Sequence, residues 1–173
     1  MRSPERALAA LLLAAAAVAT AGAALAQTAG DAPGWTESPV PPPPPLHTSG
    51  LITLDMGNDA RLHFGVDPSS LAISPDGVVR YVVVASSGSV VNAMYEGLRC
   101  ATGELKTYAR TTTAGDWHPV DQPHWRSIYA SGSTRYAVVL AEQGLCYGKA
   151  PTRSVEAMIQ QLKGPPLGQQ RYY

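Results

Sequence analysis

The sequence has no excess of either charge. Its 13 Lys and Arg residues balance 13 Asp and Glu residues over 173 positions, and neither sign forms a run. Proteins that bind nucleic acids or anionic membrane surfaces through electrostatic attraction usually carry a basic patch. This chain has neither a basic patch nor an acidic run. We therefore expect no nucleic-acid partner and no electrostatic membrane site.

Cysteine and catalytic signatures are also scarce. Cys100 and Cys146 are the only cysteines, and a lipid-anchored export product would need one directly at its cleavage point. The sequence has no G-x-S-x-G elbow, no G-x-x-x-x-G-K-[ST] loop, no H-E-x-x-H pair and no G-x-G-x-x-G opening a helix. These absences argue against the common hydrolase, nucleotide-binding and metalloprotease classes, and no cofactor is expected.

The first 26 residues have the pattern of a secretory signal peptide. Arg2 and Arg6 precede an apolar run that ends in Ala24-Leu25-Ala26, an A-x-A cleavage pattern. A short transmembrane anchor is the alternative, but the alanine content makes the run only weakly hydrophobic. We expect cleavage after Ala26, a periplasmic or secreted location, and no membrane span in the remaining chain.

Residues 27–50 are rich in proline. Five consecutive prolines at 41–45 have a fixed φ and no backbone donor, so they form a stiff polyproline II segment. We predict a disordered leader that stays outside the packed core; a stalk or docking peptide is the alternative. Trp35 and Glu37 depart from this composition, and Trp35 is a candidate to pack back on the domain.

Residues 51–164 are predicted to form one domain that begins with short strands. Asp76-Gly77 and Thr102-Gly103 lie between apolar runs and indicate hairpin turns. Together the runs predict an antiparallel meander of four to six strands. The runs span residues 51–56, 61–67, 70–74, 78–87, 89–102 and 104–112.

The C-terminal third favours helices. Residues 135–148 are apolar on most faces and suit a buried helix or another strand, with the length favouring a helix. Residues 154–164 carry a full helix signature, with Ser154 as N-cap and Gly164 at the end. The fold class is therefore α+β, an antiparallel sheet with one or two C-terminal helices packed on it. Residues 165–173 are predicted to be a flexible tail.

Cys100 has two interpretations. As a nucleophile it would need a lowered pKa and a base such as His118 or His124 close by. As a structural residue it would form a disulfide with Cys146, because thiols normally oxidise outside the cytoplasm. The predicted export favours the disulfide.

Glu96 lies on the same face of an alternating strand as Met94 and Leu98. Either it lies inside the sheet with a charged partner, or a bulge at Gly97 turns it outward. A buried Glu96 has a raised pKa and suits an acid catalyst, but a structural ion pair perturbs a pKa equally well. The candidate partners are Arg80, Arg99 and Arg126.

The segment 114–127 carries a weak candidate metal site. Its possible ligands are His118, Asp121 and His124, whose spacing matches no established histidine metal motif. Trp117 and Trp125 in the same segment are expected to anchor it on the domain, or to form a recognition surface for a peptide or glycan if they stay exposed.

Several stretches resemble the family named for a cryptic neisserial protein, a group of small exported bacterial proteins. The most specific is Y-E-G-L-R-C at residues 95–100 followed by T-G-E at 102–104. Further stretches are G-V-D-P-S-S-L at 65–71, S-P-D-G-V-V-R-Y-V-V-V at 74–84, H-W-R-S-I at 124–128 and G-L-C at 144–146. The resemblance spans residues 35–162, and it implies an exported single domain without naming an activity or catalytic residues.

Two functions follow as hypotheses. The favoured one is a non-catalytic binding or structural module of the bacterial envelope, which contacts another envelope protein or a cell-wall component. It predicts that the domain folds without residues 27–50. The alternative is a periplasmic hydrolase or isomerase that uses Glu96 or the loop with His118 and His124, which would require these groups to converge in a cleft.

Overall fold

The computed structural model describes residues 34–57, 61–111 and 115–164. The predicted signal peptide, the first part of the predicted leader and the predicted tail lie outside these ranges. In the described part of the chain, no helix is long and apolar enough to cross a membrane.

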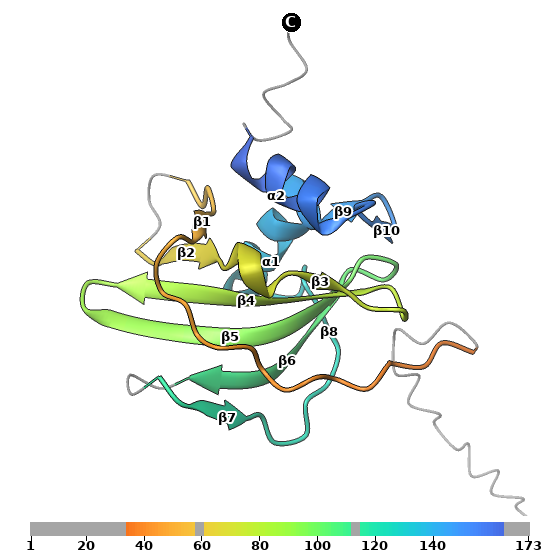
Figure 1. The fold of residues 1–173 in the computed structure, drawn as a ribbon, viewed down its shortest axis with the longest axis horizontal. Helices are drawn as coiled ribbons and strands as arrows, with labels where there is room; N and C mark the ends of the chain where they lie inside the picture. The colour runs from red at the N-terminus through yellow and green to blue at the C-terminus, as the bar shows by residue number, and fades with distance from the viewer. Residues whose placement is uncertain (1–33, 58–60, 112–114, 165–173) are drawn as a thin grey trace, which may run out of the picture.

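An antiparallel sheet forms the centre of the molecule (Figure 1). Its long strands are β4 (Val78–Ser87), β5 (Val90–Arg99) and β6 (Glu104–Thr111), which pair in sequence order. Five shorter strands extend the sheet to eight strands, more than the four to six predicted. These are β1 (Ile52–Thr53), β2 (His63–Val66), β3 (Ala72–Ile73), β7 (Trp117–Pro119) and β8 (Arg126–Ser127).

The two predicted hairpins are confirmed. Gly77 has a φ of 78° between β3 and β4, and the Asp76 carboxylate accepts a hydrogen bond from the Val78 amide at 3.1 Å. Gly103 has a φ of 65° between β5 and β6, and its amide donates to the Arg99 carbonyl at 2.9 Å. Both turns need a positive φ that glycine adopts without steric cost.

The helical part confirms the α+β class. Helix α1 (Arg135–Leu140) continues as a π-helical turn (Ala141–Leu145), and α2 spans Val155–Lys163 with the Ser154 hydroxyl accepting from the Ala157 amide at 3.2 Å. The helix predicted over 135–148 ends at Leu145, because Cys146 is already extended. There β9 (Cys146–Tyr147) and β10 (Ala150–Pro151) form a small hairpin. Two 3₁₀ turns span Pro68–Ser70 and Gly132–Thr134.

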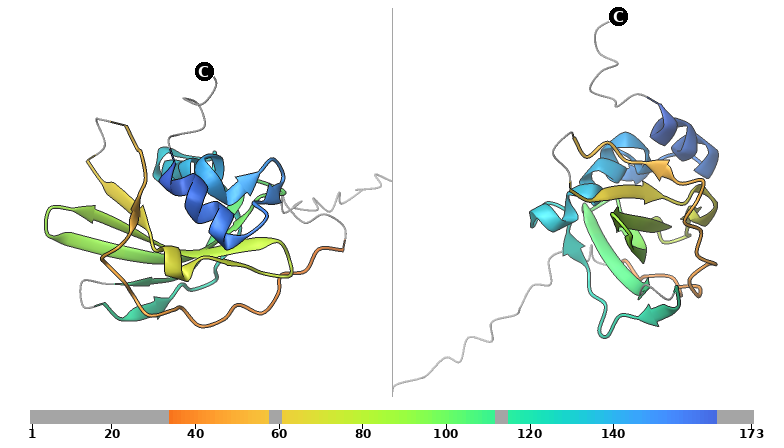
Figure 2. Two further views of the ribbon diagram at one scale, coloured as in Figure 1. Left: turned by 45° about the horizontal axis from the view of Figure 1, so that its top comes forward. Right: turned by 90° about the vertical axis from the view of Figure 1, so that its left-hand side faces the viewer.

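Each face of the sheet has its own apolar core. The helices cover one face, and Figure 2 shows the N-terminal segment crossing the opposite face. The helix-side core includes Tyr81, Leu98, Leu140 and Met158. The core on the other face is smaller and consists of Val82, Val84, Ala93, Tyr95, Tyr108 and Ala109, with Leu46 and Trp117 packed against it.

Residues 34–47, which we call the N-terminal strap, pack on this second core. The prediction of a disordered leader outside the domain is therefore wrong for this part of residues 27–50. Proline lacks a backbone donor but keeps its carbonyl as an acceptor, and the Trp117 indole donates to the Pro44 carbonyl at 2.9 Å. Trp35 also packs on the domain, as expected. The strap thus belongs to the folded unit.

Candidate functional site

Glu96 is completely buried on the helix-side face of β5, with 0% of its surface exposed. The Tyr136 hydroxyl lies 2.8 Å from Oε1 and 2.9 Å from Oε2 of Glu96. Thr107 donates to Oε1 at 2.8 Å, and Tyr81 donates to Oε2 at 3.3 Å. Burial raises the pKa of the Glu96 carboxyl, and these hydrogen bonds offset only part of that rise.

Strand register assembles this cluster. Tyr81 of β4 pairs with Glu96, which in turn pairs with Thr107 of β6, so the three side chains share one face. The register shifts beside Glu96, where Tyr95 pairs with Ala109 and leaves Tyr108 as the extra residue of a bulge. Of the two alternatives for Glu96, the inward position is therefore the one observed, and the bulge is on β6 and not at Gly97.

Of the three arginines expected as partners of Glu96, only Arg126 acts on it. Hydroxyl groups hold its carboxylate, while Arg80 and Arg99 project from the opposite face, where their pairing partners are Gly97 and Val78. Arg126 contributes a favourable charge that acts to lower the pKa of Glu96. A substrate cannot contact a carboxylate without exposed surface, so the cluster joins α1 to the sheet as a structural element.

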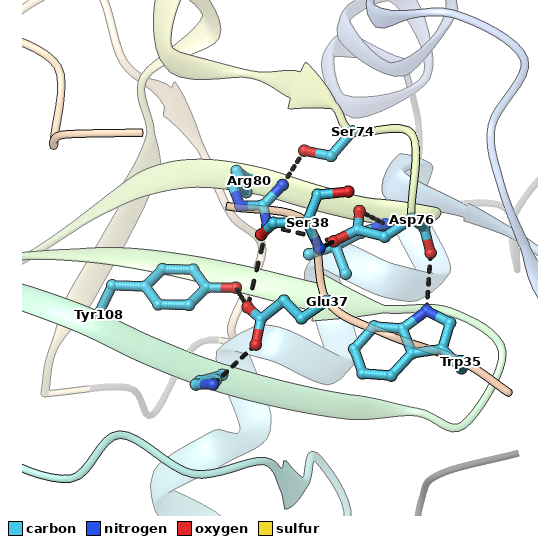
Figure 3. A network of polar contacts seen from close by, with 9 residues as sticks. Trp35, Glu37, Ser38, Ser74, Asp76, Arg80 and Tyr108 are labelled. Carbon is cyan, nitrogen blue, oxygen red and sulfur yellow. Dashed lines mark hydrogen bonds and ion pairs between the residues drawn. The ribbon is translucent and has the colours of Figure 1, made fainter. Parts of the chain in front are cut away.

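A second polar cluster fixes the start of the strap on the other face (Figure 3). Arg80, 2% exposed, donates to the Ser74 hydroxyl, to the Asp76 carboxylate at 3.2 Å and to the Ser38 carbonyl at 3.1 Å. The Ser38 amide donates to the same Asp76 carboxylate at 2.7 Å. The guanidinium thus links the β3–β4 turn to the strap backbone.

Glu37 adds a second carboxylate to this cluster, beside that of Asp76. Its carboxylate accepts from Lys106 and from the Tyr108 hydroxyl, both at 2.7 Å, and lies 3.9 Å from Arg80. Burial, together with the Glu37 carboxylate, raises the pKa of the Tyr108 phenol. Glu37 belongs to the strap, and its three partners belong to β4 and β6. The cluster therefore acts as a clamp that holds the strap on the sheet.

Three aromatic and cationic side chains complete this end. The Trp35 indole donates to the Asp76 carbonyl at 2.9 Å. The Arg99 guanidinium lies 3.7 Å from the Trp35 ring centroid, a cation–π contact, and Trp125 meets Trp35 edge-on at 5.9 Å. Arg99 and Trp125, both candidate functional residues, thus contact the strap.

The other end of the strap has its own anchors. Beyond the Trp117–Pro44 hydrogen bond, His47 Nδ1 lies 2.9 Å from the Asp67 carboxylate and 3.1 Å from the Ser69 hydroxyl. Burial opposes ionisation of Asp67, but hydrogen bonds from Ser69 and the contact with His47 outweigh it and lower the pKa of Asp67. The strap is therefore held at both ends.

The candidate metal ligands do not converge. Within residues 34–57, 61–111 and 115–164, no group of three His, Cys, Asp or Glu side chains is placed to hold a metal ion. His118 lies in β7, and His124 and Asp121 are exposed in the loop that follows. The tryptophans of this segment contact the strap, as described above.

The disulfide between Cys100 and Cys146 is confirmed, and neither cysteine is free. The nucleophile hypothesis for Cys100 is therefore wrong. The bond ties the turn after β5 to the first residue of β9. It joins the sheet to the β9–β10 hairpin, whereas the sequence placed Cys146 at the end of a helix.

An open hollow of about 710 Å³ lies between this hairpin and α2. Tyr147, 82% exposed, stands at its edge beside polar side chains from the start of α2 and the segment before it. Tyr147 was not predicted as a site residue, because it lies in the segment 135–148 that was expected to be helical; the following Gly148, with a φ of 61°, was the available turn signal. The polar lining includes Arg153, Ser154, Glu156, Gln160 and Gln161.

Comparison with known proteins gives one match. The family model of the CNP1-like family matches residues 30–163. No curated protein and no solved structure matches the chain.

Proposed function

The chain belongs to the CNP1-like family, a family of unknown function, and from this premise we propose that it is an exported, non-catalytic binding module of the bacterial envelope. Its binding site is the hollow at Tyr147, and its ligand is a cell-wall glycan. The observation that carries the proposal is the exposed Tyr147 ring, placed beside guanidinium, carboxylate and carboxamide groups.

The chemistry of the hollow suits a sugar. The apolar C–H face of a pyranose stacks on an aromatic ring, while its hydroxyls exchange hydrogen bonds with side chains such as Arg153, Glu156 and Gln160. An exposed aromatic side chain with a polar rim is typical of recognition surfaces. The volume of about 710 Å³ lies within the range of ligand pockets.

The hairpin that carries Tyr147 is held in place before any ligand arrives. Cys146, its neighbour, is bonded to Cys100, and Pro151 pairs with Cys146 across the hairpin. Thr152 donates through its amide to the Leu145 carbonyl at 3.0 Å and through its hydroxyl to the Gly144 carbonyl at 2.7 Å. A backbone that is already ordered at Tyr147 lowers the ordering cost of binding.

Export is supported by two features of the chain. The first 26 residues have the signal-peptide pattern, and a disulfide suits an oxidising compartment. The enzymatic alternative has less support, because Glu96 has no exposed surface, and among the described residues neither His118 nor His124 belongs to a group of three side chains placed to hold a metal ion.

Binding of the chain without residues 1–26 to purified cell-wall sacculi tests the proposal. We expect it to sediment with sacculi and to bind soluble glycan fragments in calorimetry. Tyr147→Ala should weaken binding by about tenfold or more, since truncation of a central aromatic contact costs about 2 kcal/mol. Tyr129→Ala is the matched control, because Tyr129 is 68% exposed and lies at a different hollow. No binding by the wild type, or equal binding by Tyr147→Ala, would contradict the proposal.

A further inference from the structure

The strap is fixed at its two ends and loosely packed between them. Glu37 and Ser38 anchor one end, and Pro44 and His47 anchor the other. Between the anchors, Val40 is 38% exposed, and a hollow of about 320 Å³ lies between residues 40–43 and the sheet. The sheet side of this hollow is lined by Tyr95, Tyr108, Ala109, Trp117 and Pro119.

Detaching the strap removes no strand from the sheet. The strap contributes no strand, since the first strand of the sheet is β1 at Ile52–Thr53. Its contacts with the domain are hydrogen bonds with side chains and turn carbonyls, ion pairs, ring contacts and the packing of Leu46 on the second core, and none is part of a strand ladder. Thr48, Ser49 and Gly50, all exposed, and Leu51, which packs on the second core, connect it to β1, and Gly50 has a φ of 72°. This connection has the character of a hinge, which reorients at low cost.

The groove under the strap has the chemistry of a polyproline-binding site. Proline-rich segments dock in aromatic-lined grooves, and their carbonyls accept hydrogen bonds because they have few donors of their own. Here Tyr95, Tyr108 and Trp117 supply the aromatic surface, and the Trp117 indole donates to Pro44. Such a groove recognises the conformation and anchors of the segment, whichever chain carries it.

We propose that this groove accepts residues 34–47 of a second copy of the chain, so that two copies exchange their straps reciprocally. Every copy carries both the groove and its ligand, and each contact of the strap can form between chains: Glu37 with Lys106 and Tyr108, Pro44 with Trp117, and His47 with Asp67. The exchange is closed and two-fold, the common form of domain swapping.

The fraction of exchanged dimer depends on protein concentration, because the chain tethers each strap to its own groove. A short linker holds the strap at an effective concentration of about 1 mM or more near its own groove, so the monomer dominates in dilute solution. The exchanged dimer gains as protein concentration rises. If the Tyr147 hollow binds glycan as proposed above, the dimer presents two such sites, but the exchange itself rests only on the strap and its groove.

Isotope mixing distinguishes exchange from the closed monomer. Unlabelled and ¹⁵N-labelled chains lacking residues 1–26, both carrying Pro42→p-benzoylphenylalanine, are unfolded together in urea with the disulfide intact and refolded at several concentrations. After irradiation, mass spectrometry identifies whether position 42 is crosslinked to the sheet of its own chain or of another. We expect mixed-label crosslinks whose fraction rises with concentration, together with a dimer in light scattering. Only like-labelled crosslinks at every concentration would overturn the proposal.

Hinge length provides an independent test. Deletion of Thr48 and Ser49 removes about 7 Å of reach, so the strap cannot keep both anchors on its own domain. The variant should show a dimer fraction raised by about tenfold, as the loss of one charged hydrogen bond within the chain implies. An insertion of Gly-Ser-Gly-Ser after Gly50 is the matched control and should remain monomeric. A shortened hinge that leaves the chain monomeric, with its crosslinks still within one chain, would refute the exchange.

Discussion

The hydroxyl of Tyr136 contacts both carboxylate oxygens of Glu96, at 2.8 and 2.9 Å, although 40 residues separate the two in sequence. Tyr136 comes from α1, and Glu96 comes from the middle of β5. The Tyr136 ring also stacks on Phe64 of β2, with 4.7 Å between the ring centroids. One side chain therefore connects the helical layer to two strands and satisfies a buried acid.

Tyr136→Phe should destabilise the fold without changing its core packing. The substitution keeps the ring on Phe64 but removes a donor to a buried carboxylate, which costs about 1–3 kcal/mol. Urea unfolding followed by circular dichroism measures the change. Tyr129→Phe is the matched control, because Tyr129 is exposed and should change stability by less than about 0.5 kcal/mol. Equal stability of the two variants would show that the hydroxyl contributes nothing.

Stability should fall as pH rises above the ordinary pKa of glutamate. Burial raises the pKa of Glu96 above 4.5 in the folded chain. Between pH 4.5 and the folded-state pKa, the folded state therefore holds a proton that the unfolded state has released. The Glu96 contribution is complete below 4.5 and is lost as pH rises through the folded-state pKa. The pKa of Asp67 is lowered from its ordinary value of 3.8, so this group has the opposite effect: below pH 3.8 it makes stability rise as pH rises.

Glu96→Gln isolates this effect. The variant cannot titrate at position 96, so the difference in unfolding free energy between wild type and variant should move against the wild type as pH increases from 4.5. Urea titrations at intervals up to pH 8 measure that difference, and the histidines cancel because both proteins carry them. A difference that stays constant, or moves toward the wild type, would show that the Glu96 pKa is not raised.

Local patterns in the sequence were sufficient to predict the long strands, the two hairpins, the last helix and the disulfide. Each depends on signals within about ten residues or on the predicted compartment: Asp76-Gly77 for a turn, Ser154 for a helix start, and a single pair of cysteines in a chain predicted to be exported. The position of Glu96 was also partly predictable, because alternation along β5 placed it among apolar neighbours.

The strap and the bulge could not be predicted in this way. Glu37 and Tyr108 are 71 residues apart, and a polyproline segment has no hydrophobic period that shows which surface it covers. The extra residue at Tyr108 arises because β6 must present Thr107 to one face and Tyr108 and Ala109 to the other. Such choices depend on packing across both faces of the sheet, which local propensity does not encode.

Gly97→Ala should destabilise the domain and loosen the strap. A Cβ at this position would overlap the Tyr108 hydroxyl and lie 2.8 Å from Val78 Cγ1, so Tyr108 would have to leave Glu37. Overpacking of this kind costs about 1–3 kcal/mol. Gly132→Ala is the matched control, because a Cβ there meets nothing within 4 Å. Thermal unfolding gives stability, and cleavage after Glu37 by a glutamate-specific endopeptidase reports release of the strap; unchanged values for Gly97→Ala would contradict the close packing.

Glu37→Gln should weaken the strap anchor. The neutral amide cannot balance Lys106 and Arg80, and the loss of charged hydrogen bonds in a partly buried site costs about 2 kcal/mol. Glu142→Gln, at an exposed position, should change stability by less than about 0.5 kcal/mol. Urea unfolding compares the two, and equal midpoints would contradict the clamp.

For the same reason, we expect removal of residues 34–47 to destabilise the domain, in contrast to the folding predicted without residues 27–50.

Removal of the disulfide should cost more than any of these substitutions. Cys100 and Cys146 close a loop with a sequence separation of 46, for which loop entropy gives about 4 kcal/mol. The variant Cys100→Ala/Cys146→Ala should therefore unfold at lower urea concentration than the oxidised wild type, and wild type with reductant should behave like the variant. Native, unreduced protein should not react with maleimide, whereas protein unfolded in reductant should take up two labels. Labelling of the native protein would mean that the bond is open, and it would also remove the fixed position of Tyr147 on which the proposed glycan site depends.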